Sequence, residues 1–407
     1  MNNYKIKKNQ FWARFEYYFI LFYLVFGYFL YDVLTISVID EVSAILLFLI
    51  LVGKKRVKEV NLFFIVVAFF FLYSVFFSVN RSYEAIVLDA IQQIKPFVFF
   101  YFFFNFNVQL NELQKYSLSR ISLYLAVLSF VIGISLDYQF YSGLFSHPAE
   151  YGIKMFVYGL LFYYYSEDKK KSKNIFLFII TLGLMSMRSK YYGYYIISVY
   201  LLYFLKSKIR VSVKFLLTFF LLGSIILYFT QEKLIAYLGE DAMESQARTV
   251  LYLSSPRVLM DYPIFGSGLA TYATWFSGVY YSPLYSLYGI DNVWGISEEF
   301  TDFIADTYFP ELVQFGLCGI LLFLMFWGKR IFAINKCYYN NREDYYIGWI
   351  IISFVFIESV ASPMLVSLNS LIPLYLLAKI TRKYDTQSNS LLLVRQESST
   401  STCEKVH

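Results

Sequence analysis

The chain has 407 residues, of which 58% are hydrophobic and 16% are charged, and its mean hydropathy is +0.52. This composition excludes the water-soluble enzyme classes and indicates a protein of the lipid bilayer. The formal net charge of +6 does not indicate a nucleic-acid partner, because the cations lie at the ends of apolar segments, where membrane topology requires them. The 3 Cys include no CxxC pair and there are only 2 His, so we expect no metal and no cofactor.

Apolar segments of membrane-spanning length recur along the chain, and they are continuous rather than alternating with period two. This pattern predicts an all-α polytopic integral membrane protein with about 12 transmembrane helices and one large extracytoplasmic loop, and not a β-barrel. In chain order, the expected spans are 17–36, 38–52, 60–79, 86–106, 121–136, 151–166, 174–187, 191–205, 211–230, 310–328, 346–362 and 364–380.

These spans divide the chain into four regions. Residues 1–230 are expected to form an N-terminal transmembrane bundle of about nine spans, and 231–309 a large extracytoplasmic loop with short helices. Residues 310–380 are expected to form the C-terminal transmembrane helices. Residues 381–407, rich in Ser, Thr and Gln, are expected to be a disordered cytoplasmic tail.

The Lys and Arg residues set the expected orientation in the membrane. The first span follows four cations in the first 14 residues and runs past Asp32 without a small-residue cleavage site, so we expect an uncleaved anchor and a cytoplasmic N-terminus. From there alternate loops are basic. The positive-inside rule then accounts for 27 of the 35 Lys and Arg and places both termini in the cytoplasm.

Eight cations remain that the topology does not explain. A cation at the outer face or within the membrane raises the free energy of insertion, by roughly 2.5–3.5 kcal/mol at a central position, so it needs a carboxylate or an anionic ligand as partner. We therefore expect the functional site to include some of these eight residues, which are Arg81, Lys95, Lys154, Arg188, Lys190, Lys233, Arg248 and Arg257.

Two pairs of these cations form candidate anion sites. Arg188 and Lys190 lie in a tight outer connection, where the arginine fork can grip phosphate oxygens and the lysine adds a mobile charge. The alternative is that both extend to lipid headgroups. Arg248 and Arg257 precede a Gly-Ser-Gly turn at 266–268, which either lets the backbone approach a ligand or is only a tight turn.

Four acidic or imidazole side chains are candidate general bases. Glu298, Asp302 and Asp306 recur at every fourth residue, which puts three carboxylates on one face if the stretch is helical. A solvated acidic face is the alternative. His147 lies in an outer segment next to Glu150 and is suited to act as a base near neutral pH, or is simply a hydrogen-bonding loop residue.

This arrangement of spans, outer cations and outer loop resembles the O-antigen polymerase and O-antigen ligase superfamily of bacterial envelope glycosyltransferases, a class C glycosyltransferase-like group. The resemblance covers most of the chain as topology, and as sequence it is confined to four segments. These are Gly143–Gly152, similar to the family's Gly-x-Phe-x-x-Pro-Asn element; Ser186–Ser189, similar to its Ser-Arg-Ser hairpin; Arg257–Tyr272, similar to its Arg…Pro-Leu-x-Gly-x-Gly stretch; and Asp306–Gly319, similar to its His/Asp-x-x-x-x-x-Leu-x-x-x-Gly-x-x-Gly element.

The resemblance implies polymerisation of lipid-linked oligosaccharide repeats, for O-antigen, capsule or exopolysaccharide, at the outer face of a bacterial cytoplasmic membrane. The growing glycan would leave undecaprenyl diphosphate for a hydroxyl of the next lipid-linked repeat. The diphosphate would bind Arg188, Arg248 and Arg257, assisted by Lys190 and Lys154, and no metal is needed because arginines supply the charge. The base would be one of Asp306, His147, Glu298 and Asp302. Membrane lipids, a chain-length regulator and a flippase are further candidate partners.

Two departures from the family pattern bear on the choice of activity. Ala149 stands where the family commonly has Asn, and Asp306 stands where ligases have a His that is thought to be used in transfer. The second departure favours a polymerase. An O-antigen ligase or other oligosaccharyltransferase remains an alternative, as does a flippase or transporter, which Lys95-Pro96 within a span would support best. A purely structural assembly protein would leave the outer arginines unexplained.

Overall fold

The computed structural model of the chain describes residues 2–32, 34, 36, 38–106, 108–135, 148–205, 208 and 246–384. These residues form α-helices joined by turns and short 3-10 or π-helical segments, and no β-strand occurs among them, which confirms the all-α fold. Five helical segments are long and apolar enough to cross a membrane: Asn9–Tyr31, Lys58–Phe77, Tyr83–Phe106, Glu112–Gly133 and Phe309–Asn340.

These five segments match five of the expected spans, and most of the other expected spans are helices that are shorter or more polar. The span expected at 211–230 lies outside the described residues. Twelve crossings therefore stay a prediction, whereas a helical protein with several apolar, membrane-length helices is what the structure shows.

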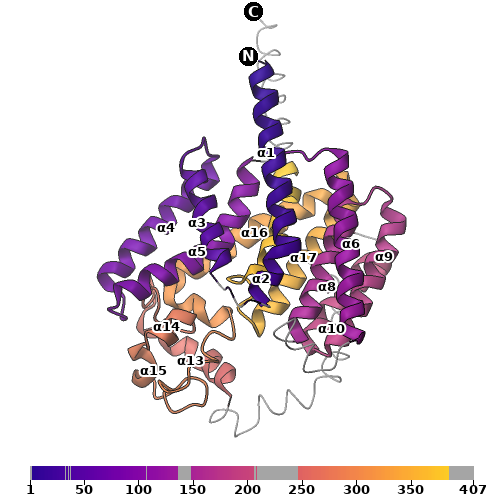
Figure 1. Ribbon diagram of the computed structural model, residues 1–407. Helices are drawn as coiled ribbons and strands as arrows, with labels where there is room; N and C mark the ends of the chain where they lie inside the picture. Colours follow the sequence, from indigo (N-terminus) through magenta and orange to yellow (C-terminus); the bar gives the residue numbers. More distant parts are fainter. Residues whose placement is uncertain are drawn as a thin grey trace, which may run out of the picture.

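Of the N-terminal helices, α3, α4 and α5 lie on one side of the molecule, α1 and α2 in its middle, and α6 on the opposite side beside α8 and α9 (Figure 1). The first, α1, continues through a π-helical turn into α2, and Pro96 lies inside α5 without ending it. Their bounds are α1 Asn2–Phe22, η1 Tyr23–Gly27, α2 Tyr28–Asp32, α3 Ile39–Val52, α4 Lys58–Phe77, α5 Tyr83–Phe106 and α6 Glu112–Ser135.

A second group of helices contains α8, which is buried along nearly its whole length and lies against α6 and α9, and α17, which lies against α10 and α16. The apolar surface of α8 is covered on all sides, as the continuous apolar sequence predicts. The bounds are α8 Pro148–Tyr165, α9 Lys169–Leu182, η2 Gly183–Ser186, α10 Ser189–Val199, η3 Tyr200–Phe204, α16 Gly316–Asn340, α17 Arg342–Val360, η5 Leu368–Ser370 and a last helix at 371–384.

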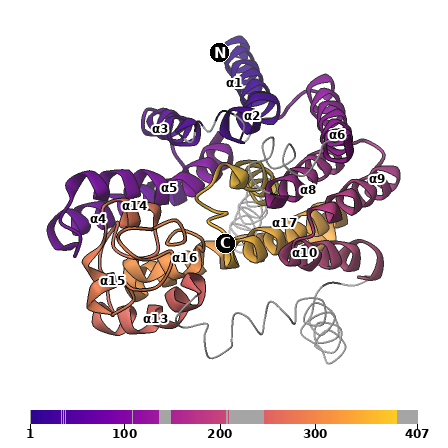
Figure 2. The same ribbon diagram turned by 60° about the horizontal axis from the view of Figure 1, so that its bottom comes forward.

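Residues 246–315 form a separate unit of short helices with its own core of buried apolar side chains. Its elements are α13 Ala247–Asp261, α14 Trp275–Val279, α15 Pro283–Leu287 and η4 Phe309–Phe315. The short helices α13, α14 and α15 lie at the end of the molecule opposite the N-terminus (Figure 1), and turning that end forward shows them beside α4, α5 and α16 (Figure 2). We call this unit the outer unit, after its expected side of the membrane.

The Gly-Ser-Gly turn anchors the outer unit to the bundle. Gly266 and Gly268 both have positive φ, and a Cβ at Gly268 would lie 2.7 Å from the Cα of Ser78. The backbone N–H of Gly268 donates to the carbonyl of Gln314 at 3.0 Å, and the Ser78 hydroxyl donates to the carbonyl of Leu269 at 3.0 Å. Since both glycines are enclosed by protein backbone, the turn serves packing and not a ligand.

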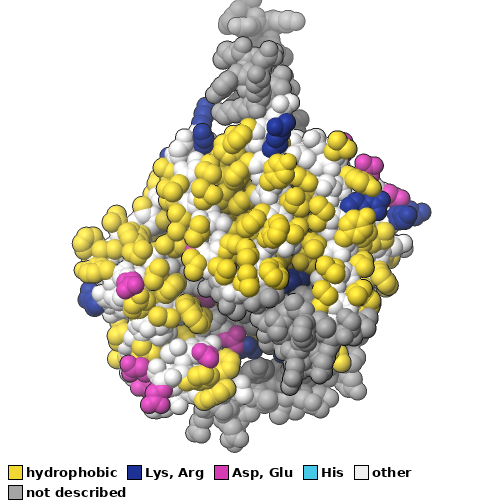
Figure 3. All heavy atoms as spheres, in the orientation of Figure 1, with side chains coloured by type: hydrophobic (Ala, Val, Ile, Leu, Met, Phe, Trp, Pro, Cys, Tyr) yellow, Lys and Arg dark blue, Asp and Glu magenta, His cyan; other side chains and the backbone are white. Residues whose placement is uncertain are grey.

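Large hydrophobic side chains remain exposed on the long helices, for example Ile65 and Phe76 of α4, each 66% exposed, and Leu324 of α16. Figure 3 shows hydrophobic side chains covering the middle of one face of the molecule. A soluble protein rarely exposes so much contiguous apolar surface. Together with the five long apolar helices, this surface gives the chain the character of a membrane protein.

Candidate functional site

A pocket of about 670 Å³ opens where α13 of the outer unit meets the adjoining ends of α8, α10 and α17. The volume falls in the range of small-molecule binding sites. Its lining combines charged and polar groups with small apolar side chains: Tyr31, Ala149, Glu150, Ile153, Arg188, Ser189, Lys190, Gln246, Arg248, Phe303, Asp306, Ala361, Ser362, Pro363, Met364, Ser367 and Asn369.

Arg188 and Lys190 enter the pocket from the start of α10. Met187 takes a left-handed conformation with φ 52°, and Arg188 follows as the extended N-cap residue of α10, so the chain reverses tightly as the sequence predicts. The Lys190 ammonium forms an ion pair with Glu358 of α17 at 2.6 Å and also donates to the carbonyl of Ala361 at 3.4 Å. This lysine therefore has a carboxylate partner from a distant helix, rather than lipid headgroups alone.

Arg248 enters the pocket from the first turn of α13 and pairs with Asp306. Its Nε donates to Oδ2 of Asp306 at 2.6 Å, and its Nη2 donates to the same oxygen. Both side chains are half-buried. Burial raises the pKa of Asp306, while the positive charge and hydrogen bonds of Arg248 lower it.

Glu150 also lines the pocket, although the sequence indicated it only as a neighbour of His147. It lies in the first turn of α8, and its Oε2 accepts a hydrogen bond from Nδ2 of Asn369 at 2.8 Å. Glu358 and Asn369 were not singled out at all. Each is a polar residue within an expected apolar span, 346–362 or 364–380, and that signal in the sequence could have identified them.

The structure thus brings together four of the nine predicted site residues, namely Arg188, Lys190, Arg248 and Asp306. They come from three segments far apart in the sequence. Arg257 lies outside the lining and is exposed. It follows Arg248 by nine residues, which is about two and a half helical turns, so the two arginines project from opposite sides of α13.

Three other predicted site residues, Lys154, Glu298 and Asp302, also lie away from the pocket lining. Lys154 is buried within α8, with its ammonium 5.5 Å from the centre of the Tyr28 ring. Glu298 and Asp302 are exposed, and the segment that contains them forms successive turns instead of a helix. The prediction that they share a helical face with Asp306 is therefore wrong. The turns already begin at 291, and Gly295, with φ 89°, adds a left-handed position that a regular helix does not contain. His147 lies outside the described residues, as does Lys233.

The charges at the pocket balance. Three cations, Arg188, Lys190 and Arg248, line it together with the carboxylates of Glu150 and Asp306. The carboxylate of Glu358 lies beside the pocket and binds Lys190, and Asp306 binds Arg248. An anionic ligand would displace such carboxylates and take over their cations. Among the described residues, no three His, Cys, Asp or Glu side chains are placed to hold a metal ion.

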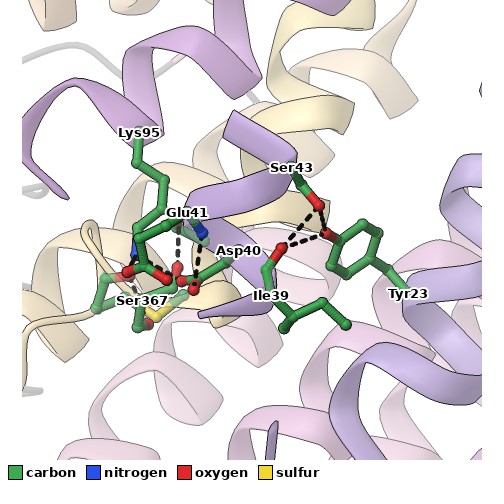
Figure 4. A network of polar contacts seen from close by, with 9 residues as sticks. Tyr23, Ile39, Asp40, Glu41, Ser43, Lys95 and Ser367 are labelled. Carbon is green, nitrogen blue, oxygen red and sulfur yellow. Dashed lines mark hydrogen bonds and ion pairs between the residues drawn. The ribbon is translucent and has the colours of Figure 1, made fainter. Parts of the chain in front are cut away.

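Lys95, another cation that topology does not explain, has carboxylate partners inside the bundle. Its ammonium lies 2.5 Å from Oδ2 of Asp40 and 2.7 Å from Oε1 of Glu41. Figure 4 shows Lys95 of α5 reaching toward both acids at the start of α3, with Ser367 alongside. We call Lys95, Asp40 and Glu41 the buried triad. Since Ser367 also lines the pocket, the buried triad lies next to the pocket wall.

Comparison with known proteins adds no relationship to these observations. No family model matches the chain, and no curated protein matches its sequence.

Proposed function

We propose that this protein is a glycosyltransferase that polymerises lipid-linked oligosaccharide repeats at the outer face of a cytoplasmic membrane. The observation that carries the proposal is the convergence of Arg188, Lys190 and Arg248 on one pocket at the end of an apolar helical bundle. Arg188 and Lys190 lie about sixty residues from Arg248 in the sequence, and all three are cations that the positive-inside rule does not explain. A pocket at this level can reach both a lipid carrier and a polar glycan.

The reaction requires a group that stabilises the leaving diphosphate. In the donor, the glycan is bonded through its anomeric carbon to undecaprenyl diphosphate, and negative charge builds on the bridging oxygen as that bond breaks. Arg188 and Arg248 offer planar donor forks for phosphate oxygens, and Lys190 offers a point charge. Preorganised cations aimed at developing charge lower the barrier without a metal. Binding of the diphosphate releases Asp306 and Glu358 from their present partners.

A second candidate function is a lipid-linked oligosaccharide flippase or transporter, favoured by the buried triad. Lys95 and Asp40 are almost fully buried, and α5 contains Pro96 directly after the lysine. Ionisable groups within membrane spans often mark ion or proton pathways, and proline interrupts helices in transporters. The pocket arginines argue against this alternative, because they lie at the end of the bundle and not at its centre.

The test is a profile of lipid-linked glycans, resolved by repeat number, from cells that lack the protein. If the protein is a polymerase, these cells should accumulate the lipid carrier bearing a single repeat. That single repeat should still be transferred onward, but without being lengthened. Long chains retained on the carrier would indicate a ligase. Single repeats trapped on the cytoplasmic leaflet would indicate a flippase, and either result would refute the polymerase.

Complementation of those cells then tests the pocket itself. Arg188→Ala should restore no polymer although the protein reaches the membrane in normal amount, because the diphosphate loses a bidentate ligand. Arg188→Lys should also be poor. Arg81→Ala is the matched control, since Arg81 is an exposed outer arginine that lies away from the pocket lining. Normal polymer in the Arg188→Ala cells would refute the diphosphate clamp.

A further inference from the structure

Two carboxylates, those of Asp306 and Glu150, line the pocket, and a third, that of Glu358, binds the pocket lysine Lys190. Asp306 is bound to the guanidinium of Arg248, and Glu358 is bound to the ammonium of Lys190. Glu150 forms no ion pair with any described residue, and its hydrogen-bond partner is the neutral amide of Asn369. Asp306 and Glu358 are the counter-ions that the phosphate-binding cations need whenever no donor is bound. Glu150 is not needed for that role, so its carboxylate can take up a proton throughout the reaction cycle.

The geometry holds Glu150 in a fixed position with one oxygen left to react. Its backbone lies in the first turn of α8, two residues after Pro148, and its Oε2 accepts a hydrogen bond from Asn369 at 2.8 Å. Asn369 is itself buried, in the short helix η5. No hydrogen bond within the described part of the chain engages Oε1 of Glu150. The carboxylate lines the pocket that also contains the three cations.

We propose that Glu150 is the general base of the transfer reaction and that Asn369 is its positioning residue. This assignment rests on the proposed function. The carboxylate removes the proton from the attacking hydroxyl of the acceptor sugar, and the oxygen electron pair of that hydroxyl forms the new bond to the anomeric carbon of the donor. The bond from the anomeric carbon to the diphosphate breaks, and its electron pair leaves with undecaprenyl diphosphate. The proton on Glu150 is then released to water.

The acid–base character of Glu150 suits this role. Glu150 precedes the expected span 151–166, and burial, together with the charge of Glu358, raises the pKa of its carboxyl to about 7. The hydrogen bond from Asn369 and the charge of Lys190 lower the pKa. A base is most effective when its pKa lies near the working pH. Among the described residues, the phenols of Tyr28, Tyr31 and Tyr194 also lie within its electrostatic reach, and Arg188 and Asp306 line the same pocket.

The experiment uses the full-length protein purified in detergent. The substrate is the lipid-linked single repeat extracted from cells that lack the protein, and the product is the ladder of longer glycans on the carrier. Glu150→Gln should reduce the rate of ladder formation by about 10²–10⁴-fold, the usual contribution of a general base. Its affinity for undecaprenyl diphosphate and its thermal midpoint should equal those of the wild type, because the amide keeps the shape of the side chain.

A pH profile separates a base from a merely structural group. A carboxylate with a pKa of about 7 is protonated below that pH, so the wild-type rate should rise with pH up to about 7 and then level off. The residual rate of Glu150→Gln should lack this rise. Glu299→Gln, which changes an exposed carboxylate of the outer unit, is the control and should behave as the wild type does.

The outcomes are distinguishable. A Glu150→Gln protein with a wild-type rate, or with the wild-type pH profile, would overturn the assignment of the base and leave the polymerase intact. A Glu150→Gln protein that no longer binds undecaprenyl diphosphate would also overturn it, because Glu150 would then serve donor binding or structure. Failure of the wild type itself to form any ladder would instead refute the proposed function.

Discussion

Replacing Lys95 with Met tests the buried triad quantitatively. The change keeps the length of the side chain and removes the ammonium that lies 2.5 Å from Asp40 and 2.7 Å from Glu41. The side chains of Lys95 and Asp40 are 2% and 1% exposed, so water cannot replace the lost partner. Removing one member of a buried ion pair typically costs about 3–5 kcal/mol. Uptake of a proton by Asp40 would limit this loss, so we expect a value at the lower end.

The measurement is equilibrium unfolding of the purified protein in mixed detergent micelles, followed by circular dichroism. A second variant, in which Lys95→Met is combined with Asp40→Asn and Glu41→Gln, serves as the matched control. It removes all three charges while keeping the shape, and it should recover most of the lost stability, since neutral groups need no counter-ion. A Lys95→Met protein within about 1 kcal/mol of the wild type would refute the interpretation of the triad as a buried ion pair.

The same variants separate the two candidate functions. If the triad only joins α3 to α5, the neutral triple variant should still form long glycans, because the pocket cations remain in place. If the triad carries ions or protons for transport, the triple variant should be inactive although it is stable. Glycan length in cells that carry the variant distinguishes these results.

Two further predictions concern the outer unit. Gly268→Ala should destabilise the docking of this unit by about 1–3 kcal/mol, because it forces a side chain into a left-handed backbone and against Ser78; the readout is faster cleavage of the unit by added protease. Gly289→Ala, where φ is 65° but nothing lies within 4 Å, is the control and should have a smaller effect, so equal cleavage rates would contradict the packing argument. Arg248→Ala should reduce polymer formation at least about tenfold more than Arg257→Ala, a difference of 1.4 kcal/mol or more, because these side chains project from opposite sides of α13; equal losses would contradict the placement of the pocket.

The sequence predicted those features that depend on local chemistry. Long apolar segments predicted the membrane-length helices. The cations that topology did not explain proved informative, because burial requires partners for them: Lys95, Lys190 and Arg248 all pair with carboxylates. The extended Arg188 after a left-handed Met187 agrees with the tight hairpin expected there.

The predictions that failed concern features that depend on packing between distant segments. Glu298 and Asp302 have helical spacing, but the chain around them turns repeatedly to cover the core of the outer unit. The Gly-Ser-Gly turn resembled a ligand loop, yet its glycines are needed because the backbones of Ser78 and Gln314 approach them closely. Glu150 meets Asn369 across more than two hundred residues, so no local pattern could have paired them.

The most direct test of the central claim is an experimental structure of the protein with undecaprenyl diphosphate bound. The account predicts that the diphosphate lies in the pocket, with its oxygens within hydrogen-bonding distance of Arg188 and Arg248, and that Asp306 has moved away from Arg248. A diphosphate bound elsewhere, with the Arg248–Asp306 and Lys190–Glu358 pairs intact, would contradict it.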